Sequence, residues 1–133
     1  MGKTPGSLSD VCQRHGVVLL LQFGSTVSGP VRPDSDLDLA MLLSDPELSF
    51  ERFGEIHHDL QQLFGNREID LSTINRADPL FLKKVLERCQ LLYGSARRLQ
   101  ELRIYSFKRY QDHRRYLALE RRYVERRLAA ERP

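Results

Sequence analysis

Two apolar segments separated by a short polar connection set the strongest limit on how this chain folds. Residues 17–23 read VVLLLQF and residues 37–43 read LDLAMLL, and both have the length and composition of buried strands. The connection after the first segment, residues 24–33, is rich in Gly, Ser and Pro. These segments predict a strand, a turn and a returning strand in one sheet.

Helical periodicity and capping residues predict helices around these strands. The expected elements are a helix over 7–15, a helix that starts at Asp45-Pro46-Glu47 and stops at Gly65, a strand over 67–74, a helix from Asp78-Pro79 to about Arg88, an edge strand over 90–93, and helix from Ser95 nearly to the end, with a break allowed near residue 112. The predicted class is α/β (α+β), with a small mixed sheet of three to four strands flanked by helices. A long basic helical region follows at the C-terminus.

Charge divides the chain into two unequal parts. Residues 1–96 carry 9 Lys and Arg against 13 Asp and Glu, whereas residues 97–133 carry 12 against 5. Basic residues interleaved with tyrosines suit either single-stranded nucleic acid or an acidic protein surface. A solvated helix face and a tail folded back on the acidic part are the structural alternatives. We favour a protein partner over direct binding of nucleic acid.

Composition limits the cellular setting of the chain. No apolar run approaches the roughly 18 residues of a membrane helix, and the N-terminus lacks a signal pattern, so we expect a cytoplasmic protein with no membrane association. Cys12 and Cys89 lie far apart without metal-ligand spacing and are expected to be free thiols. At 133 residues the chain has the size of one domain.

Acidic residues interrupt the apolar strands in a regular way. Asp36 and Asp38 are two residues apart, so in a strand they point to the same side, about 6.6 Å apart. Asp70 lies between Ile69 and Leu71 of the third predicted strand and would complete a cluster of three carboxylates, although Glu68 is an alternative third member. Carboxylates gathered in this way suit Mg²⁺, and two ions can be bridged by such a set.

The turn after the first strand has the character of a phosphate site. Gly24 allows a phosphate to approach the backbone closely, and the Ser25 hydroxyl adds a hydrogen-bond donor. A phosphate-binding turn followed after ten residues by the acidic pair predicts a site for a metal ion and a triphosphate. The acids could also be interpreted as a calcium-binding loop. Such a loop requires glycine at the position that Leu39 occupies, so this interpretation is weak.

At these residues the chain resembles the DNA polymerase β-like nucleotidyltransferase superfamily. The resemblance rests on Phe23-Gly24-Ser25, on Asp36-Leu37-Asp38-Leu39 and on Asp70, and the size is similar to the minimal nucleotidyltransferases that act as antitoxins of HEPN toxins. It implies a nucleotidyltransferase core over residues 1–96, with residues 97–133 as a basic extension that binds the partner.

The resemblance also implies a reaction and the roles of the site residues. A nucleoside monophosphate, either AMP from ATP or the equivalent group of another nucleoside triphosphate, would pass to a hydroxyl, which in this group is typically a tyrosine of the HEPN toxin. Asp36, Asp38 and Asp70 would be catalytic and would hold two Mg²⁺ ions, with Asp70 on the acceptor side, while Gly24 and Ser25 would bind the triphosphate. Homo- or hetero-oligomers are compatible with this function.

One departure from the family pattern leaves a role unassigned. Many relatives carry an arginine shortly after the Gly-Ser pair, but here the first arginine after it is Arg32. Arg32, Lys83 and Lys84 are all candidates for the cation that contacts the phosphates.

Two other functions compete with protein nucleotidylation. A transferase that acts on a small molecule such as an aminoglycoside would need a pocket to enclose its acceptor, and the core of about 95 residues leaves no separate domain to form one. A binding-only antitoxin would neutralise its partner without catalysis, and the complete set of acids argues against an inert protein.

Overall fold

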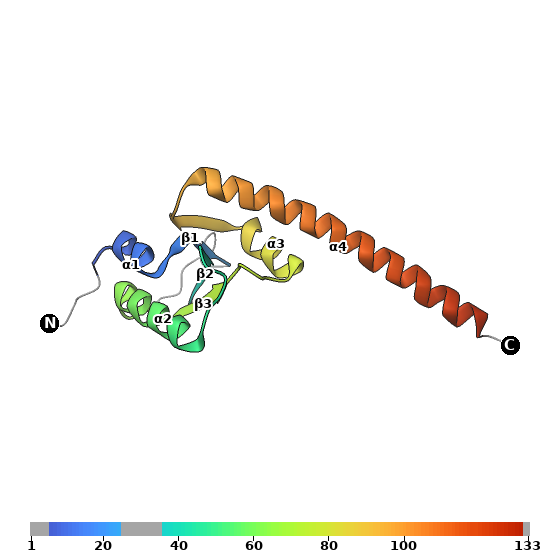
Figure 1. Cartoon of the computed structure of the whole chain (residues 1–133), viewed down its shortest axis with the longest axis horizontal. Coiled ribbons are helices and arrows are strands. Elements are labelled where there is room, and N and C mark those ends of the chain that lie inside the picture. The colour runs from blue at the N-terminus through green and yellow to red at the C-terminus, as the bar shows by residue number, and fades with distance from the viewer. Residues whose placement is uncertain (1–5, 25–35, 132–133) are drawn as a thin grey trace.

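The computed structural model describes residues 6–24 and 36–131, and in these residues a four-stranded sheet is surrounded by helices (Figure 1). The elements in chain order are α1 (Leu8–His15), β1 (Val17–Phe23), β2 (Leu37–Leu43), α2 (Phe50–Phe64), β3 (Ile69–Thr73), α3 (Pro79–Glu87), β4 (Cys89–Tyr93) and α4 (Ala96–Ala130). The predicted fold class is confirmed.

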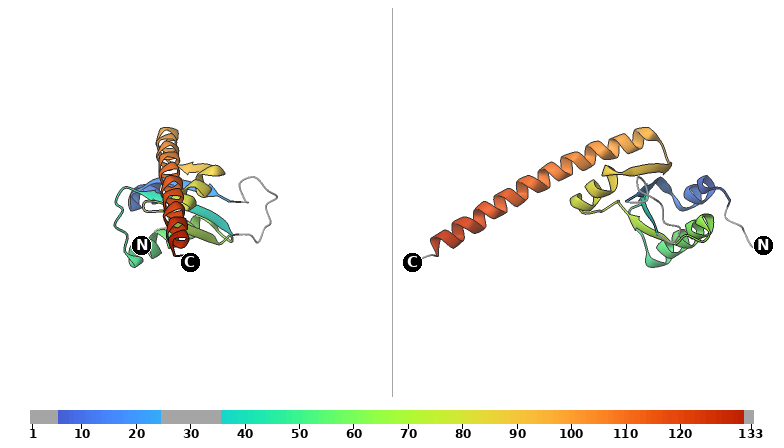
Figure 2. Two further views of the ribbon diagram at one scale, coloured as in Figure 1. Left: turned by 90° about the vertical axis from the view of Figure 1, so that its right-hand side faces the viewer. Right: turned by 180° about the vertical axis from the view of Figure 1, so that it is seen from behind.

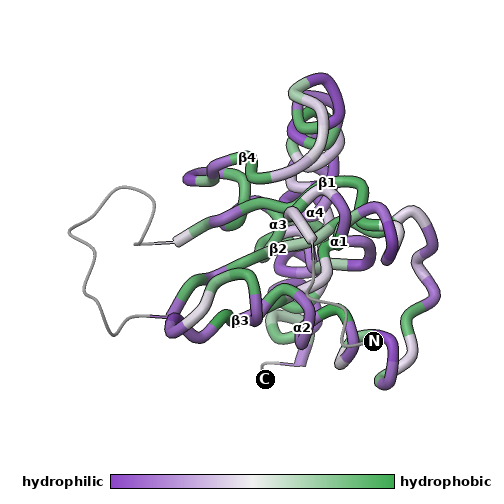
Figure 3. Tube along the Cα trace, turned by 90° about the vertical axis from the view of Figure 1, so that its left-hand side faces the viewer, coloured by the Kyte–Doolittle hydropathy of each residue, from purple (hydrophilic) through white to green (hydrophobic). Residues whose placement is uncertain are grey.

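The sheet is mixed and is covered by helices on both faces. Its strand order is β3-β2-β1-β4, with β1 antiparallel to both β2 and β4 and with β2 parallel to β3. Helices α1 and α2 pack on one face, and α3 with the first part of α4 packs on the other. Figure 3 shows the hydrophobic character of the central strands. Burial on both faces explains why β1 is a nearly continuous apolar run.

Helix α4 extends well beyond the rest of the molecule (Figures 1 and 2). Its first turns bury Leu99 and Leu102 against the sheet and α3, and the helix then continues without a break near residue 112. Residues 95–132 contain neither glycine nor proline, so nothing in the sequence interrupts the helical hydrogen bonds. No helix of the described ranges combines the length and apolar character required to cross a membrane.

Two boundaries differ from the sequence-based prediction. Helix α2 begins at Phe50, because the Ser49 hydroxyl accepts the backbone N–H of Arg52 at 3.1 Å and so caps the helix. The Asp45 carboxylate accepts the N–H of Glu47 at 3.0 Å and closes a local turn instead. Strand β3 is also shorter than the predicted 67–74.

Candidate active site

Strands β2 and β3 place two of the predicted acids side by side. In their parallel pairing Asp38 lies opposite Asp70, and neighbouring strands are about 4.8 Å apart. The residues on either side of each aspartate are buried in the cluster beneath α1 and α2: Leu37, Leu39, Ile69 and Leu71. Because side chains alternate along a strand, both carboxylates point to the opposite face, where α3 packs.

Asp36 adds a third negative charge to this pair. It directly precedes β2 and is exposed, and it is two residues from Asp38. Burial raises the pKa of the Asp38 carboxyl, the charges of Asp70 and Asp36 raise it further, and the charge of Lys84 lowers it. The three acids therefore influence one another, and their repulsion is only partly balanced by a cation of the protein.

The Gly24 turn lies against the same carboxylate. Phe23, the last residue of β1, pairs with Asp38, so the chain leaves β1 next to the acids. Gly24 has φ +87°, and a Cβ built on it would stand 2.7 Å from the Asp38 Oδ2 atom. A side chain at this position would thus collide with the acidic site. Ser25 and Arg32, which the sequence also singled out, fall outside the described residues.

Glu68, the alternative third acid, has a different place. It is exposed before β3 begins, and its backbone carbonyl accepts the N–H of Leu37 at 2.9 Å. The charges that raise the pKa of Asp38 come from Asp70 and Asp36. The arrangement thus brings Asp70, rather than Glu68, next to Asp38.

The chemistry of these side chains suits a hard cation shared with phosphates. As placed in the described ranges, no three His, Cys, Asp or Glu side chains could hold a metal ion among themselves. Mg²⁺ is usually bound by one or two protein carboxylates, with water and substrate phosphates as its other ligands. The unbalanced charge around Asp38 therefore fits Mg²⁺ whose remaining ligands are water and nucleotide phosphates.

A partly buried cluster of polar contacts on the far face of the sheet was not foreseen from the sequence. His15 Nε2 lies 2.7 Å from Asp59 Oδ2, and Arg14 lies 3.3 Å from the same oxygen. This cluster joins α1 to α2 and is separated from the acids by the sheet, so its role is structural. His57 stacks on Phe53 of the same helix.

Comparisons with known proteins agree with this geometry. Residues 7–98 match the family model described as "Polymerase beta, Nucleotidyltransferase". Comparison with curated protein sequences gives no match.

Solved structures of similar fold include toxin–antitoxin complexes. One, a toxin–antitoxin with AMP-PNP, has a TM-score of 0.69 and 20% identity, and the match covers 92% of this chain and 95% of the other. Another, tri-AMPylated Shewanella oneidensis HEPN toxin in complex with MNT antitoxin, has a TM-score of 0.64, 18% identity and coverage of 95% and 96%.

An antibiotic-modifying enzyme shares the fold over part of its length. Spectinomycin adenyltransferase AAD(9) from Enterococcus faecialis, with ATP and spectinomycin, has a TM-score of 0.51 and 17% identity, with coverage of 71% of this chain and 56% of that chain. Since the family model spans more than half of the sequence and the fold agrees with it, the chain belongs to the polymerase beta family of nucleotidyltransferases.

Proposed function

We propose that the chain transfers AMP from ATP to a tyrosine hydroxyl of a HEPN toxin, in a reaction that depends on Mg²⁺, and thereby acts as its antitoxin. The observation that carries the proposal is the pairing of Asp38 with Asp70 across β2 and β3, with Gly24, the residue after β1, against the Asp38 carboxylate. Family membership supplies the reaction class. The similar complexes with AMP-PNP and with an AMPylated HEPN toxin support ATP and the partner.

In this reaction the acids and the turn hold the two substrates in line. Asp36 and Asp38, with Asp70, would hold Mg²⁺, which when bound offsets negative charge on the phosphates and carboxylates. Asp70 accepts the proton of the acceptor hydroxyl. The acceptor oxygen forms a bond to the α-phosphorus, the bond from that phosphorus to the bridging oxygen breaks, and pyrophosphate leaves. Gly24 and Ser25 bind the triphosphate through backbone N–H groups and the hydroxyl.

The projecting part of α4 is the surface that we assign to the protein partner. The stripe that is buried against the core at Leu99 and Ser106 continues, at helical spacing, through Tyr110, Leu117 and Val124. Beyond the core this stripe is uncovered, and Leu117 and Val124 are each 46% exposed. An apolar stripe rimmed by arginines has the composition of a protein interface. Because the acidic site is open on the same side of the sheet as α4, a partner bound there could present a tyrosine to it.

Labelled ATP provides the direct test. The chain is incubated with Mg²⁺, [α-³²P]ATP and a candidate HEPN protein, and the products are examined by gel and by mass spectrometry for an added AMP on tyrosine. We expect label on the partner with the native chain and none with Asp36→Asn/Asp38→Asn. Absence of label with the native chain and a partner that it binds would refute the proposal.

The same assay separates the two competing functions. If the chain modified spectinomycin or an aminoglycoside but no protein, it would be a small-molecule transferase. The similarity of its fold to AAD(9) is the reason to test this function. Full neutralisation of the toxin by Asp36→Asn/Asp38→Asn would indicate an antitoxin that acts by binding alone. Asp70→Asn with unchanged turnover would remove the proton-accepting role of Asp70 and leave the rest of the proposal in place.

A further inference from the structure

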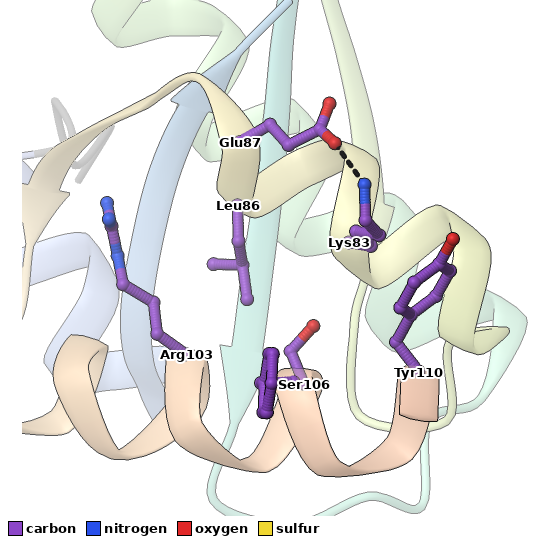
Figure 4. A pocket seen from close by; sticks show the side chains of 7 residues that line it. Lys83, Leu86, Glu87, Arg103, Ser106 and Tyr110 are labelled. Atoms are coloured by element: carbon purple, nitrogen blue, oxygen red, sulfur yellow. Dashed lines mark hydrogen bonds and ion pairs between the residues drawn. The ribbon is translucent and has the colours of Figure 1, made fainter. Parts of the chain in front are cut away.

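Two adjacent lysines of α3 have different surroundings. The Lys83 ammonium forms an ion pair with Glu87, one turn further along α3, and lies 5.0 Å above the centre of the Tyr110 ring. Figure 4 shows the Lys83–Glu87 pair on α3 and the Tyr110 ring, which comes from α4, beside Lys83. The charge of Lys83 is therefore already matched by a carboxylate and an aromatic ring of the protein.

Lys84 faces a different direction and has no such partner. Successive residues of a helix point about 100° apart, so Lys84 projects in a different direction from Lys83. Glu87 lies three residues further on and borders the same space as Lys84, but its carboxylate is paired with Lys83. Lys84 is exposed, and in the described part of the chain its side chain makes no hydrogen bond or ion pair. It lines a cavity of about 290 Å³ together with Phe23, Gly24, Glu87 and Arg88. The cavity thus places an ammonium that forms no ion pair in the described residues next to the turn that lies against Asp38.

We propose that Lys84 binds the β- and γ-phosphates of the nucleoside triphosphate in this cavity, and so supplies the cation that the Gly-Ser turn lacks. This inference rests on the proposed function. The acceptor attacks the α-phosphorus, so that atom must lie at the carboxylates. The β- and γ-phosphates then extend away from the carboxylates and need a separate space beside them. The cavity beside Gly24 offers such a space. Lys84 and Arg88, the residue that caps α3, contribute positive charge to its wall, and Glu87, which also lines it, is paired with Lys83.

The electrostatics of the site support this assignment. The charge of Lys84 lowers the pKa of Asp38, so the ammonium lies within electrostatic reach of the carboxylate although the two form no ion pair. A lysine is a mobile point charge that suits phosphate oxygens, and the flexible stem allows it to follow the leaving pyrophosphate. As negative charge develops on that leaving group, Lys84 would act as a positioning and charge-stabilising residue.

The test compares the two lysines as a matched pair. Binding of AMP-PNP and of AMP in Mg²⁺ is measured by isothermal titration calorimetry for the native chain, Lys84→Met, Lys84→Arg and the control Lys83→Met. Loss of a charged hydrogen bond predicts about 10- to 100-fold weaker AMP-PNP binding by Lys84→Met. Binding of AMP by Lys84→Met, and of AMP-PNP by Lys83→Met and Lys84→Arg, should stay within about threefold of the native value.

Each result decides one question. Native AMP-PNP affinity in Lys84→Met, an equal loss in Lys83→Met, or an equal loss of AMP binding would overturn the role of Lys84 and leave the proposed function standing. A native chain that binds no AMP-PNP and transfers no AMP would remove the proposed function and the inference with it. Thermal unfolding of each free variant establishes that the binding changes do not come from loss of the fold.

Discussion

Replacing Gly24 by alanine tests the geometry of the site with a control from the same chain. Gly24 and Gly65 both have positive φ, +87° and +64°, so alanine at either position incurs backbone strain of about 1–3 kcal/mol. A Cβ at Gly65 would meet nothing within 4 Å, whereas at Gly24 it would stand 2.7 Å from Asp38 Oδ2. Both variants therefore lose stability, but only Gly24→Ala must displace the carboxylate.

The expected sizes can be stated for a thermal-unfolding assay. Strain of about 1–3 kcal/mol lowers the Tm of a chain of this length by roughly 3–18 °C in either variant. AMP-PNP with Mg²⁺, at a hundred times the native Kd, adds about 2.7 kcal/mol to the stability of the native chain and should raise its Tm by roughly 8–16 °C. Gly65→Ala should keep this increase, and Gly24→Ala should lose most of it.

Two results would refute this reasoning. If Gly24→Ala kept the full increase of Tm with nucleotide, then Asp38 and the turn would not form part of a nucleotide site. If Gly65→Ala lost the increase as well, the loss would come from general destabilisation. The position of Gly24 against Asp38 would then not be the cause of the lost nucleotide binding.

Three further perturbations follow from the electrostatics and exposure of particular side chains. Burial and neighbouring carboxylates raise the pKa of Asp38 in the folded chain above its ordinary 3.8. The protonated carboxyl therefore stabilises the fold below pH 3.8, and this stabilisation is lost as the pH rises through the higher pKa of the folded state. Asp38→Asn should therefore raise Tm at pH 7 in the presence of a chelator, and an unchanged or lower Tm would contradict this. Burial raises the pKa of Cys12 to about 11, so iodoacetamide at pH 8 should alkylate the half-buried Cys89 first, as read by mass spectrometry, and the reverse order would argue against the packing of α1. Leu117→Arg/Val124→Arg should leave Tm within about 2 °C of the native value, because both side chains are exposed, and should weaken binding of the protein partner more than tenfold in a calorimetric titration. Native affinity in that variant would place the interface elsewhere.

The central part of the site could be predicted because strand periodicity is a local property. Alternation in LDLAMLL and IDL fixes the face on which Asp38 and Asp70 lie, once the apolar neighbours are assigned to the core. The opposition of these two residues needs the parallel register of β2 and β3, which the sequence does not state. The sequence therefore supported the proximity of Asp38 and Asp70 only as an expectation, and a different pairing of the strands would have separated them.

Other features depend on contacts that no local pattern records. His15 pairs with Asp59 across 44 positions, so neither residue stands out when it is read alone. Asp45 and Ser49 are both good caps, and the choice of Ser49 depends on where α2 can pack on the sheet. By contrast, the different directions of Lys83 and Lys84 could have been found from α3 itself, because its buried residues Leu82, Val85 and Leu86 already define the core-facing side.

The charge of α4 bears on why this helix projects from the core. Its ion pairs, such as Arg97 with Glu101 and Arg127 with Glu131, lie within the helix, and none in the described residues joins it to the acidic core. A tail folded back on the core would instead have set its arginines against Asp36, Asp38 and Asp70. The cation that lowers the pKa of Asp38 is Lys84 of α3. The positive charge of α4 is therefore not used to balance the acids, and it stays available to steer a negatively charged partner toward the open site, an effect that added salt should weaken.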